Sequence, residues 1–562
     1  MKNDSSNQPS KAVEKPVFFG FAVEVWQRGR NPRLKFRWGR IGGLFAILLM
    51  AGYGAFCGAL FWFYKERRQF DEITVAQVIT WPFKRAEFRR QMGDYFIERS
   101  AEEFENQNFA QGFYFLRAGV ARAPEDLEAR KLLAEFFEFG FRRTGQAVQV
   151  LEDGIPYAKN DVDYLRVFIS MLLRNQEDQR VIEFAENHLH SPEDFDFPNE
   201  LEENSEEWKQ LRWQALLAYS AAQAYYFRGN YDRAEDLLRN YGLPGTHDAI
   251  LLQALIQWQR GQQGLAAEML EAGLERYPES DTYLLQLTRF YRDLGQPDTA
   301  RRYAILRAIN SPDNPRPRID LLYSFNQMGD TQRELAEVNG LIRKYSDNEE
   351  VLLLIGNFAA DTGQQKLARR VYNLALQQNF DISTFALLVI EAQIVSDDFE
   401  EAIRFCEELV EEEPAWLADR MPIFNSLRAV AYYGTERVDL GQLYLNDLLS
   451  SRELRVETLL AVSRRLEQLS LLEESAAVLE DAFNRNPNNQ AALTGLIQIN
   501  LKRNQTEQIP ELVATLLDMR RPSYSLLEDV YAELGRDRYL FTPEQDALLD
   551  ELKAVLGERS TS

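Results

Sequence analysis

The sequence predicts an all-α chain in which a solenoid of antiparallel helix pairs follows one N-terminal transmembrane helix. The first observation is a turn residue that returns every 34 positions over much of the chain, which is typical of a stacked helical repeat. The second is a stretch of 24 uncharged residues near the N-terminus. The third is a composition with 45% apolar and 12% aromatic residues, which indicates a folded chain rather than a disordered one.

The charge of the 562-residue chain is unevenly distributed, with a formal net value of −23. Residues 1–70 hold 12 Lys and Arg against 4 Asp and Glu, whereas the remaining residues hold 52 against 83. A large acidic body repels nucleic acid and anionic lipid. The composition therefore argues against a nucleic-acid partner.

Residues 1–40 form a polar and then basic tail, and the 24 uncharged residues follow it as Ile41–Tyr64. A helix of this length is ~36 Å long, enough to cross a ~30 Å hydrocarbon core. Trp38 and Trp62 lie at its ends, where interfacial aromatics occur. A buried core helix is the alternative, but basic clusters flank the stretch. A cleaved signal peptide is disfavoured by the length and by the 40-residue tail. We therefore expect an uncleaved anchor that contacts membrane lipid.

The basic residues before Ile41–Tyr64 indicate the orientation of this anchor; they are Arg28, Arg30, Arg33, Lys35, Arg37 and Arg40. Fewer basic residues follow the stretch. The positive-inside rule therefore predicts a single-pass protein of the cell membrane with a cytoplasmic N-terminus and an extracytoplasmic solenoid. Residues 65–92 are predicted to be a linker helix broken at Trp81-Pro82, because proline disfavours helix in the residue before it.

The repeat is defined by its turn residues, which stand 34 apart at Gly261, Gly295, Gly329, Gly363 and Asp397. Five positions later come Ala266, Ala300, Glu334, Ala368 and Ala402. A small residue there lets the second helix of a pair approach the first. The same frame extends downstream to Glu436, Ser470 and Asn504, and upstream to Gly229, Gln176, Arg142 and Gln107. About twelve units are therefore expected over residues 93–523, with the clearest one in Ala221–Leu238.

This pattern resembles the tetratricopeptide repeat family, and the resemblance covers about three quarters of the chain. It implies a right-handed superhelix of antiparallel helix pairs, whose inner groove binds a peptide or protein. In the family this groove is lined by first helices. The matching positions here are Trp258, Arg289, Arg292, Tyr323, Asn326 and Asn357. These residues mix aromatic anchors with hydrogen-bond donors, which suits peptide capture. The alternative is that they are ordinary helix surface.

Two further segments complete the predicted organisation. Residues 191–209 interrupt the repeats with an acidic, proline-containing insertion, which we interpret as a solvated loop. Residues 524–562 are predicted to be capping helices and a tail. Within them, Thr542-Pro543-Glu544-Gln545 has the pattern of a helix start. Gly557 is expected to end that helix.

The sequence predicts no catalytic, cofactor-binding or metal-binding residues. Cys57 and Cys406 are the only cysteines, and they lie in different parts of the chain, so neither a disulfide framework nor a thiolate zinc site is expected. The three histidines, His188, His190 and His247, do not form a metal-binding pattern. No small-molecule substrate is expected.

The repeats, the anchor and the linker together imply a membrane-anchored scaffold for protein–protein interactions. By analogy with the family, such a scaffold would assemble an envelope complex for secretion or polysaccharide export. A second hypothesis places the solenoid in the cytoplasm as a regulatory adaptor of a membrane enzyme. A third, a repeat-containing enzyme, is disfavoured because only about 40 residues remain outside the repeats, linker and anchor, too few for an ordinary catalytic domain.

Overall fold

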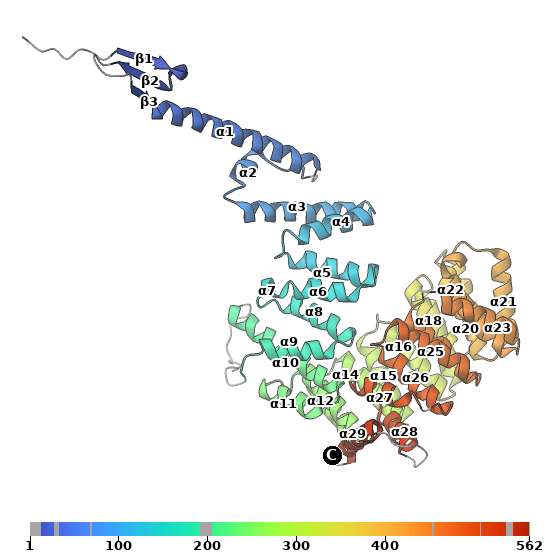
Figure 1. Cartoon of the computed structure of the whole chain (residues 1–562). Coiled ribbons are helices and arrows are strands. Elements are labelled where there is room, and N and C mark those ends of the chain that lie inside the picture. The colour runs from blue at the N-terminus through green and yellow to red at the C-terminus, as the bar shows by residue number, and fades with distance from the viewer. Residues whose placement is uncertain are drawn as a thin grey trace, which may run out of the picture. The chain divides into compact units, whose positions relative to one another are not determined.

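The computed structural model describes residues 13–26, 33–67, 70–191, 205–451, 454–505, 507–535 and 543–560. The chain forms two compact units, Met1–Phe168 and Ile169–Ser562. Figure 1 shows that helices dominate both of them. We call them unit 1 and unit 2.

Unit 1 begins with a small antiparallel sheet that the sequence analysis did not predict. Its strands β1 (Val13–Val17), β2 (Ala22–Trp26) and β3 (Arg33–Phe36) pair in chain order. Apolar and charged residues alternate along β3 and in the Val23-Glu24-Val25 part of β2, which is the period of a strand. Part of the predicted basic tail therefore has regular structure. Arg28 and Arg30 lie outside the described residues.

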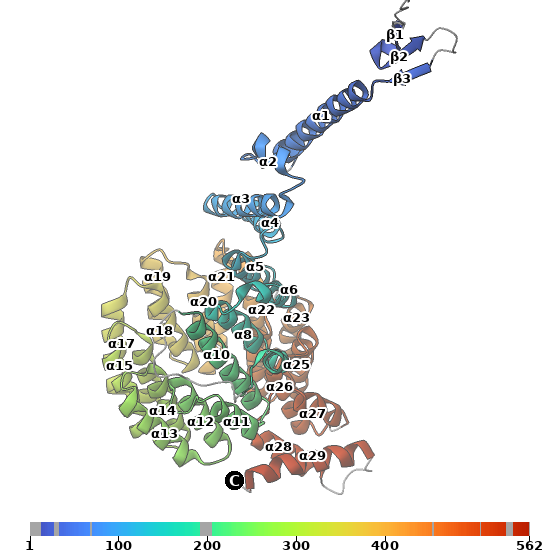
Figure 2. The same cartoon turned by 90° about the vertical axis from the view of Figure 1, so that its left-hand side faces the viewer.

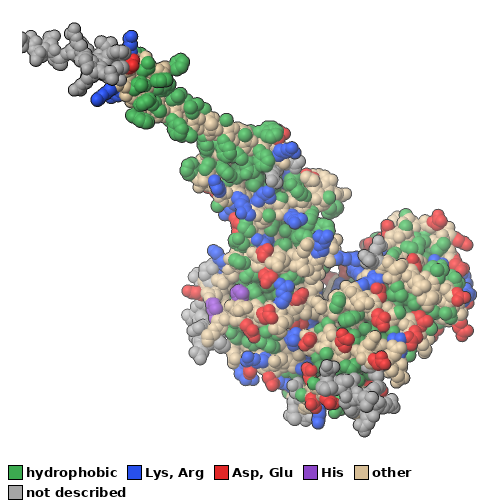
Figure 3. Space-filling view, in the orientation of Figure 1, with side chains coloured by type: hydrophobic (Ala, Val, Ile, Leu, Met, Phe, Trp, Pro, Cys, Tyr) green, Lys and Arg blue, Asp and Glu red, His purple; other side chains and the backbone are tan. Residues whose placement is uncertain are grey.

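The uncharged stretch forms α1 (Trp38–Trp62), which continues as one π-helical turn, η2 (Phe63–Arg67). By length and composition this helix can cross a membrane, and only 6% of its most apolar window is buried. Figure 3 shows hydrophobic side chains covering it. This exposure is the reverse of what a buried core helix would show, so the core-helix alternative is wrong.

The break predicted at Trp81-Pro82 is present between α2 (Val75–Thr80) and α3 (Arg85–Glu105). A hydrophobic cluster joins the end of α1 to both helices; it includes Cys57, Phe70, Val78, Phe88 and Phe96. The remaining helices of unit 1 are α4 (Phe109–Val120), α5 (Leu127–Glu135), η3 (Phe136–Gly140), α6 (Thr144–Glu152) and α7 (Ile155–Ala158). The next helix, α8 (Val162–Arg174), runs from unit 1 into unit 2.

Unit 2 is a series of antiparallel helix pairs. After α8 they are α9 (Asp178–His188), α10 (Glu206–Phe227), α11 (Tyr231–Asn240), α12 (His247–Gln259), α13 (Gln263–Arg276), α14 (Asp281–Asp293), α15 (Pro297–Asn310), α16 (Arg316–Gln327), α17 (Thr331–Tyr345), α18 (Glu349–Asp361) and α19 (Gln365–Gln377). They continue with α20 (Ile382–Val395), α21 (Phe399–Glu412), α22 (Leu417–Gly434), α23 (Val438–Ser450), α24 (Val456–Gln468), α25 (Leu472–Arg485), α26 (Gln490–Lys502) and α27 (Ile509–Leu517). Most of the acidic insertion, residues 192–204, lies outside the described residues.

The predicted repeat register is confirmed at every turn. All twelve predicted turn residues have a positive φ, between 54° and 82°; they are Gln107, Arg142, Gln176, Gly229, Gly261, Gly295, Gly329, Gly363, Asp397, Glu436, Ser470 and Asn504. A left-handed residue at this place ends the first helix and reverses the chain. At the Gly295 turn, for example, the next N–H, that of Gln296, bonds back to the Tyr291 carbonyl at 2.8 Å. The described residues therefore contain twelve helix pairs, from α3–α4 to α26–α27.

The predicted small residues lie between the helices of each pair. Ala266, Ala300, Ala368 and Ala402 are all buried. Glu334 occupies the equivalent position in α17 and is also buried, at 7% exposure. Its carboxylate accepts hydrogen bonds from the amides of Asn326 and Gln364, which satisfies a charge that would otherwise be costly to bury.

Two helices, α28 (Tyr524–Leu534) and α29 (Pro543–Ser560), cover the last repeat. Their apolar side chains pack with Leu493, Ile497 and Val513 of α26 and α27. Gly557 does not end α29, which runs on to Ser560, so that prediction is wrong. A glycine inside a helix costs only ~1 kcal/mol relative to alanine, which the rest of the helix can absorb. Thr542 lies outside the described residues.

Candidate binding surface

The first helices of successive repeats line the inside of unit 2. From α16 to α26, each first helix packs on the first helix of the next repeat. In a curved stack of helix pairs, the layer whose members lie closest together is on the concave side. We call the surface formed by these helices and by α12 and α14 the concave wall.

Arg289 and Arg292 are exposed on α14, and their charges act on a half-buried carboxyl group of the next first helix. Burial raises the pKa of that carboxyl, Asp320, while the charges of Arg307, Arg289 and Arg292 oppose the rise. Arg307 is only 8% exposed and bonds both Asp320 and Asp281. Asp320 already has this buried partner, so the two predicted arginines keep their exposed guanidinium groups at the surface, where Arg292 also lies 3.9 Å from the exposed Asp293 carboxylate.

Tyr323 is fixed on the concave wall by the next repeat. Its hydroxyl donates a 2.6 Å hydrogen bond to the Asp361 carboxylate of α18, and its ring meets Phe358 edge-on at 5.0 Å between centroids. Burial and the bond to Asp361 raise the pKa of Tyr323, and the Asp320 charge raises it further. Three predicted residues, Arg289, Arg292 and Tyr323, therefore interact electrostatically with Asp320.

The other three predicted residues have different surroundings. The Trp258 ring is half-buried and lies parallel to Phe290, with the centroids 3.9 Å apart. Asn326 donates to Glu334 of its own repeat at 3.1 Å. Asn357 is exposed on α18. Trp258 thus packs one repeat on the next, Asn326 joins the two helices of one repeat, and Asn357 presents its side chain to solvent.

The concave wall also carries a carboxylate that the sequence analysis missed. Glu391 is the only charged residue of α20, and burial raises its pKa, as does the charge of Asp361. Arg465 of α24 lies 3.8 Å from it, reaching past α22. A lone carboxylate in an apolar helix is a signal that could have identified this position.

An apolar depression of about 300 Å³ lies beside Glu391, between α20, α22 and α24. Its apolar lining comes from Leu387, Ile394, Ile423, Leu427, Val430 and Val462. A depression that combines apolar walls with a few charged groups can hold an anchoring side chain of a bound peptide.

Unit 2 also closes on itself. Arg520, after α27, donates to both oxygens of the Asp178 carboxylate at 2.7 Å and to the Leu173 carbonyl at 2.5 Å. Its guanidinium lies 3.9 Å from the centre of the Phe227 ring. The Arg521 N–H donates to the Phe227 carbonyl at 2.6 Å. Figure 2 shows the chain winding round until α28 returns beside α11. We call this junction of residues 173–178, 227–232 and 518–524 the seam.

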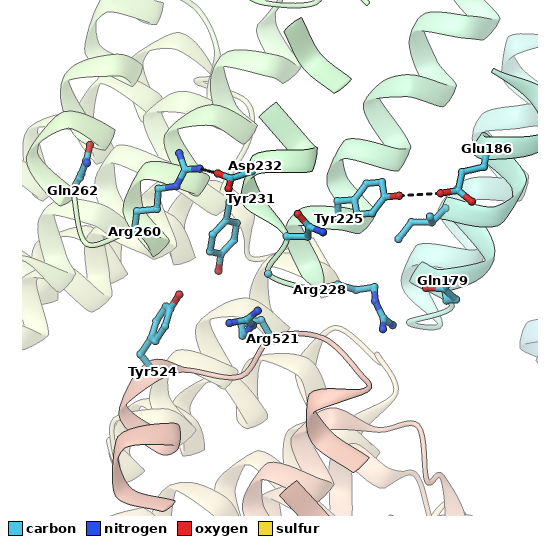
Figure 4. A pocket seen from close by; sticks show the side chains of 13 residues that line it. Gln179, Glu186, Tyr225, Arg228, Tyr231, Asp232, Arg260, Gln262, Arg521 and Tyr524 are labelled. Carbon is cyan, nitrogen blue, oxygen red and sulfur yellow. Dashed lines mark hydrogen bonds and ion pairs between the residues drawn. The ribbon is translucent and has the colours of Figure 1, made fainter. Parts of the chain in front are cut away.

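The seam encloses a polar pocket of about 690 Å³ (Figure 4). Tyr225 donates to Glu186 at 3.2 Å on one side, and Arg260 pairs with Asp232 at 2.6 Å on the other. A side chain at Gly229 would collide with the guanidinium of Arg521. Glycine at this turn therefore serves both the left-handed backbone and the close approach of the C-terminal segment.

No family model and no curated protein matches the chain. The structure is similar to a tetratricopeptide repeat protein from Parabacteroides merdae, at 16% identity over 44% of this chain and 97% of that one, with a TM-score of 0.28. It is similar to yeast Tom70, at 12% identity over 82% and 99%, with a TM-score of 0.31. It is also similar to the APC/C hetero-tetramer Cut9–Hcn1, at 12% identity over 83% and 96%, with a TM-score of 0.24.

The architecture of the chain is that of a tetratricopeptide-type solenoid. This statement rests on the twelve turns with a positive φ and their spacing, on the paired helices, and on the small residues buried between them. It confirms the fold that the resemblance implied.

Proposed function

We propose that the chain is a membrane-anchored scaffold that binds segments of other proteins on the concave wall of unit 2. The observation that carries the proposal is that two exposed arginines, Arg289 and Arg292, and the half-buried Tyr323 stand on consecutive first helices and interact electrostatically with the same carboxyl group, Asp320. Exposed guanidinium groups form bidentate hydrogen bonds with carboxylates. Arginine and tyrosine are also enriched at the energetic centres of protein interfaces.

The same residues favour a particular kind of segment. The two arginines carry positive charge in a chain whose net charge is −23, so an acidic segment gains from binding there rather than elsewhere on the surface. The depression beside Glu391 supplies an apolar contact on the same wall. The best ligand is therefore an extended segment that combines acidic residues with an apolar side chain.

The anchor in this proposal is α1, which contacts the lipid of the cell membrane. Residues 33–40, which lead into the helix, contain four basic residues: Arg33, Lys35, Arg37 and Arg40. They favour a cytoplasmic N-terminus and an extracytoplasmic solenoid. On that side of the membrane the scaffold would hold components of an envelope complex, such as one for secretion or polysaccharide export. The proposal assigns no catalytic activity, because the described chain consists almost wholly of helix pairs, anchor and cap.

A crosslinking experiment tests the binding wall. Asn357 is exposed on α18, so a photoreactive benzophenone residue at this position should capture the partner in intact membranes. Replacing Arg289 and Arg292 together by alanine should strongly reduce the yield of that crosslink. The matched control removes two exposed arginines from second helices, Arg333 and Arg404. Equal yields from both double variants, with unchanged circular dichroism, would overturn the proposed binding wall.

The membrane topology is tested separately, because the alternative function differs mainly in the side of the membrane on which the solenoid lies. A cytoplasmic solenoid would make the chain a regulatory adaptor of a membrane enzyme. A phosphatase fused to the C-terminus is active only outside the cytoplasm. We expect an active fusion, whereas an inactive fusion with an active cytoplasmic reporter at the same place would favour the adaptor.

A further inference from the structure

The segment Val75–Phe83 is an exposed apolar stretch directly after the predicted anchor. Its nine residues carry no charge, and Lys84 and Arg85 follow it at once. Val75 is 58% exposed, Ile79 is 48% exposed and Phe83 is 89% exposed. We call residues 75–83 the return segment, because it runs back along α1 after the chain has left that helix.

Contacts with α1 give the depth of the return segment. The Tyr53 hydroxyl donates to the Ile79 carbonyl at 2.5 Å, and the Trp81 ring lies 6.3 Å from the Phe56 ring. About 20 helical residues cross a ~30 Å hydrocarbon core, so a span that starts at Ile41 ends near Leu60. Tyr53 lies ~10 Å inside that end at ~1.5 Å per residue. The return segment is therefore level with the lipid-facing part of α1.

Several backbone groups of the return segment are hydrogen-bonded within the chain, which lowers the cost of such a depth. Unpaired N–H and C=O groups are costly in lipid. In the turn that ends the segment, the N–H groups of Trp81 and Phe83 donate to Val78 and Thr80, and Pro82 has no N–H to satisfy. The Thr80 hydroxyl donates to the Ala76 carbonyl at 2.9 Å. The Thr74 side chain caps the start of α2.

The side chains around the turn have the order found at a membrane surface. Trp81 is half-buried next to Phe83, and the Arg85 guanidinium lies 4.8 Å from the Trp81 ring. Tryptophan favours the headgroup region, and long basic side chains extend from it toward phosphate. Figure 3 shows the hydrophobic surface of α1 continuing into the region that follows it.

We propose that the return segment is a second membrane contact, inserted into the leaflet from which α1 emerges. Ile79 and Phe83 enter the outer acyl region, while Lys84 and Arg85 bind lipid phosphates. Two contacts on one surface restrict how the first helix pair can rotate about the anchor, because Val78 and Cys57 belong to the same buried cluster as Phe88 of α3. The inference rests on the proposed role of α1 as a membrane anchor.

Spin-label accessibility in the full chain tests this inference. The protein is reconstituted in vesicles of phosphatidylcholine and phosphatidylglycerol, with Cys57→Ala and Cys406→Ala to remove the native thiols. Labels are placed at Phe83→Cys, at Leu48→Cys in α1 and at Phe139→Cys in η3. Leu48 is 61% exposed and Phe139 is 67% exposed. Each label is then exposed to oxygen, which concentrates in lipid, and to a nickel chelate, which stays in water.

We expect the ratio of oxygen to nickel collisions at Phe83 to be severalfold higher than at Phe139, and to approach the ratio at Leu48. A water-like ratio at Phe83 with a lipid-like ratio at Leu48 would overturn the second contact and leave the anchor intact. A water-like ratio at Leu48 would overturn the anchor itself. Protection of Phe83 from both reagents would indicate a protein partner instead of lipid, and would also overturn the inference.

Discussion

Arg520 and Asp178 stand 342 positions apart in the chain and form a bidentate ion pair at the seam of unit 2. The Asp178 side chain is 3% exposed and that of Arg520 is 19% exposed. A pair this deeply buried differs from a surface salt bridge, because loss of one partner leaves the other charge without solvent or counter-charge.

Replacing Arg520 by alanine should open the seam. We expect a loss of ~3–5 kcal/mol, the cost of breaking a buried pair, in the opening free energy of residues 173–178 and 518–524. Native-state hydrogen exchange of the two segments measures it. The control is Arg437→Ala, which breaks an exposed pair with Glu400 and should cost less than ~1 kcal/mol. Unchanged exchange in both segments of the Arg520→Ala variant would show that the seam is not held by this pair.

Two glycine substitutions should distinguish the cost of a left-handed turn residue from the cost of a steric clash at the seam. Gly229 and Gly295 both have a positive φ, so alanine at either strains the backbone by ~1–2 kcal/mol. An added Cβ meets the Arg521 guanidinium at Gly229 but nothing within 4 Å at Gly295. Urea unfolding should therefore show a larger loss for Gly229→Ala than for Gly295→Ala, together with faster hydrogen exchange of residues 518–524 in the first variant alone. Equal losses would mean that Arg521 can move aside freely.

A stabilising substitution follows from the same turns. Glu436 has φ 59° and is exposed, so its side chain gains no packing in return for the left-handed backbone. Glu436→Gly should raise the free energy of unfolding by ~1 kcal/mol. Asn504→Gly is the matched control, and it should gain less because asparagine tolerates this conformation. Chemical denaturation monitored by circular dichroism compares the two, and a loss of stability for Glu436→Gly would contradict the account.

The twelve turns show how much of the fold is predictable from the sequence. Their spacing is set by the length of two helices and a turn, so it persists where the residue type does not. Arg142, Glu436 and Ser470 are poor left-handed residues, and their register identified them nonetheless. The long apolar helix α1 and the proline break after α2 were predictable for a similar reason, because each depends on a local property of a short segment.

The features of the fold and of the candidate site that the sequence did not predict depend on contacts between distant segments. The period of the repeats does not determine how far the stack curves, so the meeting of Asp178 with Arg520 could not be predicted. The binding role of the six groove residues stays a prediction. The pattern indicated Arg289, Arg292 and Tyr323, but not that Trp258 would lie against Phe290. The alternation Val23-Glu24-Val25 is present in the sequence, but it is too short to predict a strand. The basic residues around it are typical of a polar tail, which is what the sequence predicted there.

The last prediction concerns the pH dependence of Glu391. Burial raises the pKa of its carboxyl in the folded chain, whereas the unfolded value is ~4.3. Between these two values the folded state binds more protons than the unfolded state, so the contribution of Glu391 to stability rises as the pH falls. At neutral pH the charged form costs stability. Glu391→Gln should therefore make α20 more stable than in the natural chain at pH ~7, with the difference vanishing near pH ~4.

Hydrogen exchange of α20 at several pH values, corrected for intrinsic exchange, measures this difference. Glu457→Gln removes an equal charge from the lining of the same depression and controls for net charge. The Arg465 charge, 3.8 Å away, lowers the Glu391 pKa and so limits the size of the effect. A Glu391→Gln variant that is less stable at neutral pH than at pH ~4, relative to the natural chain, would mean that the attraction of Arg465 exceeds the cost of burial.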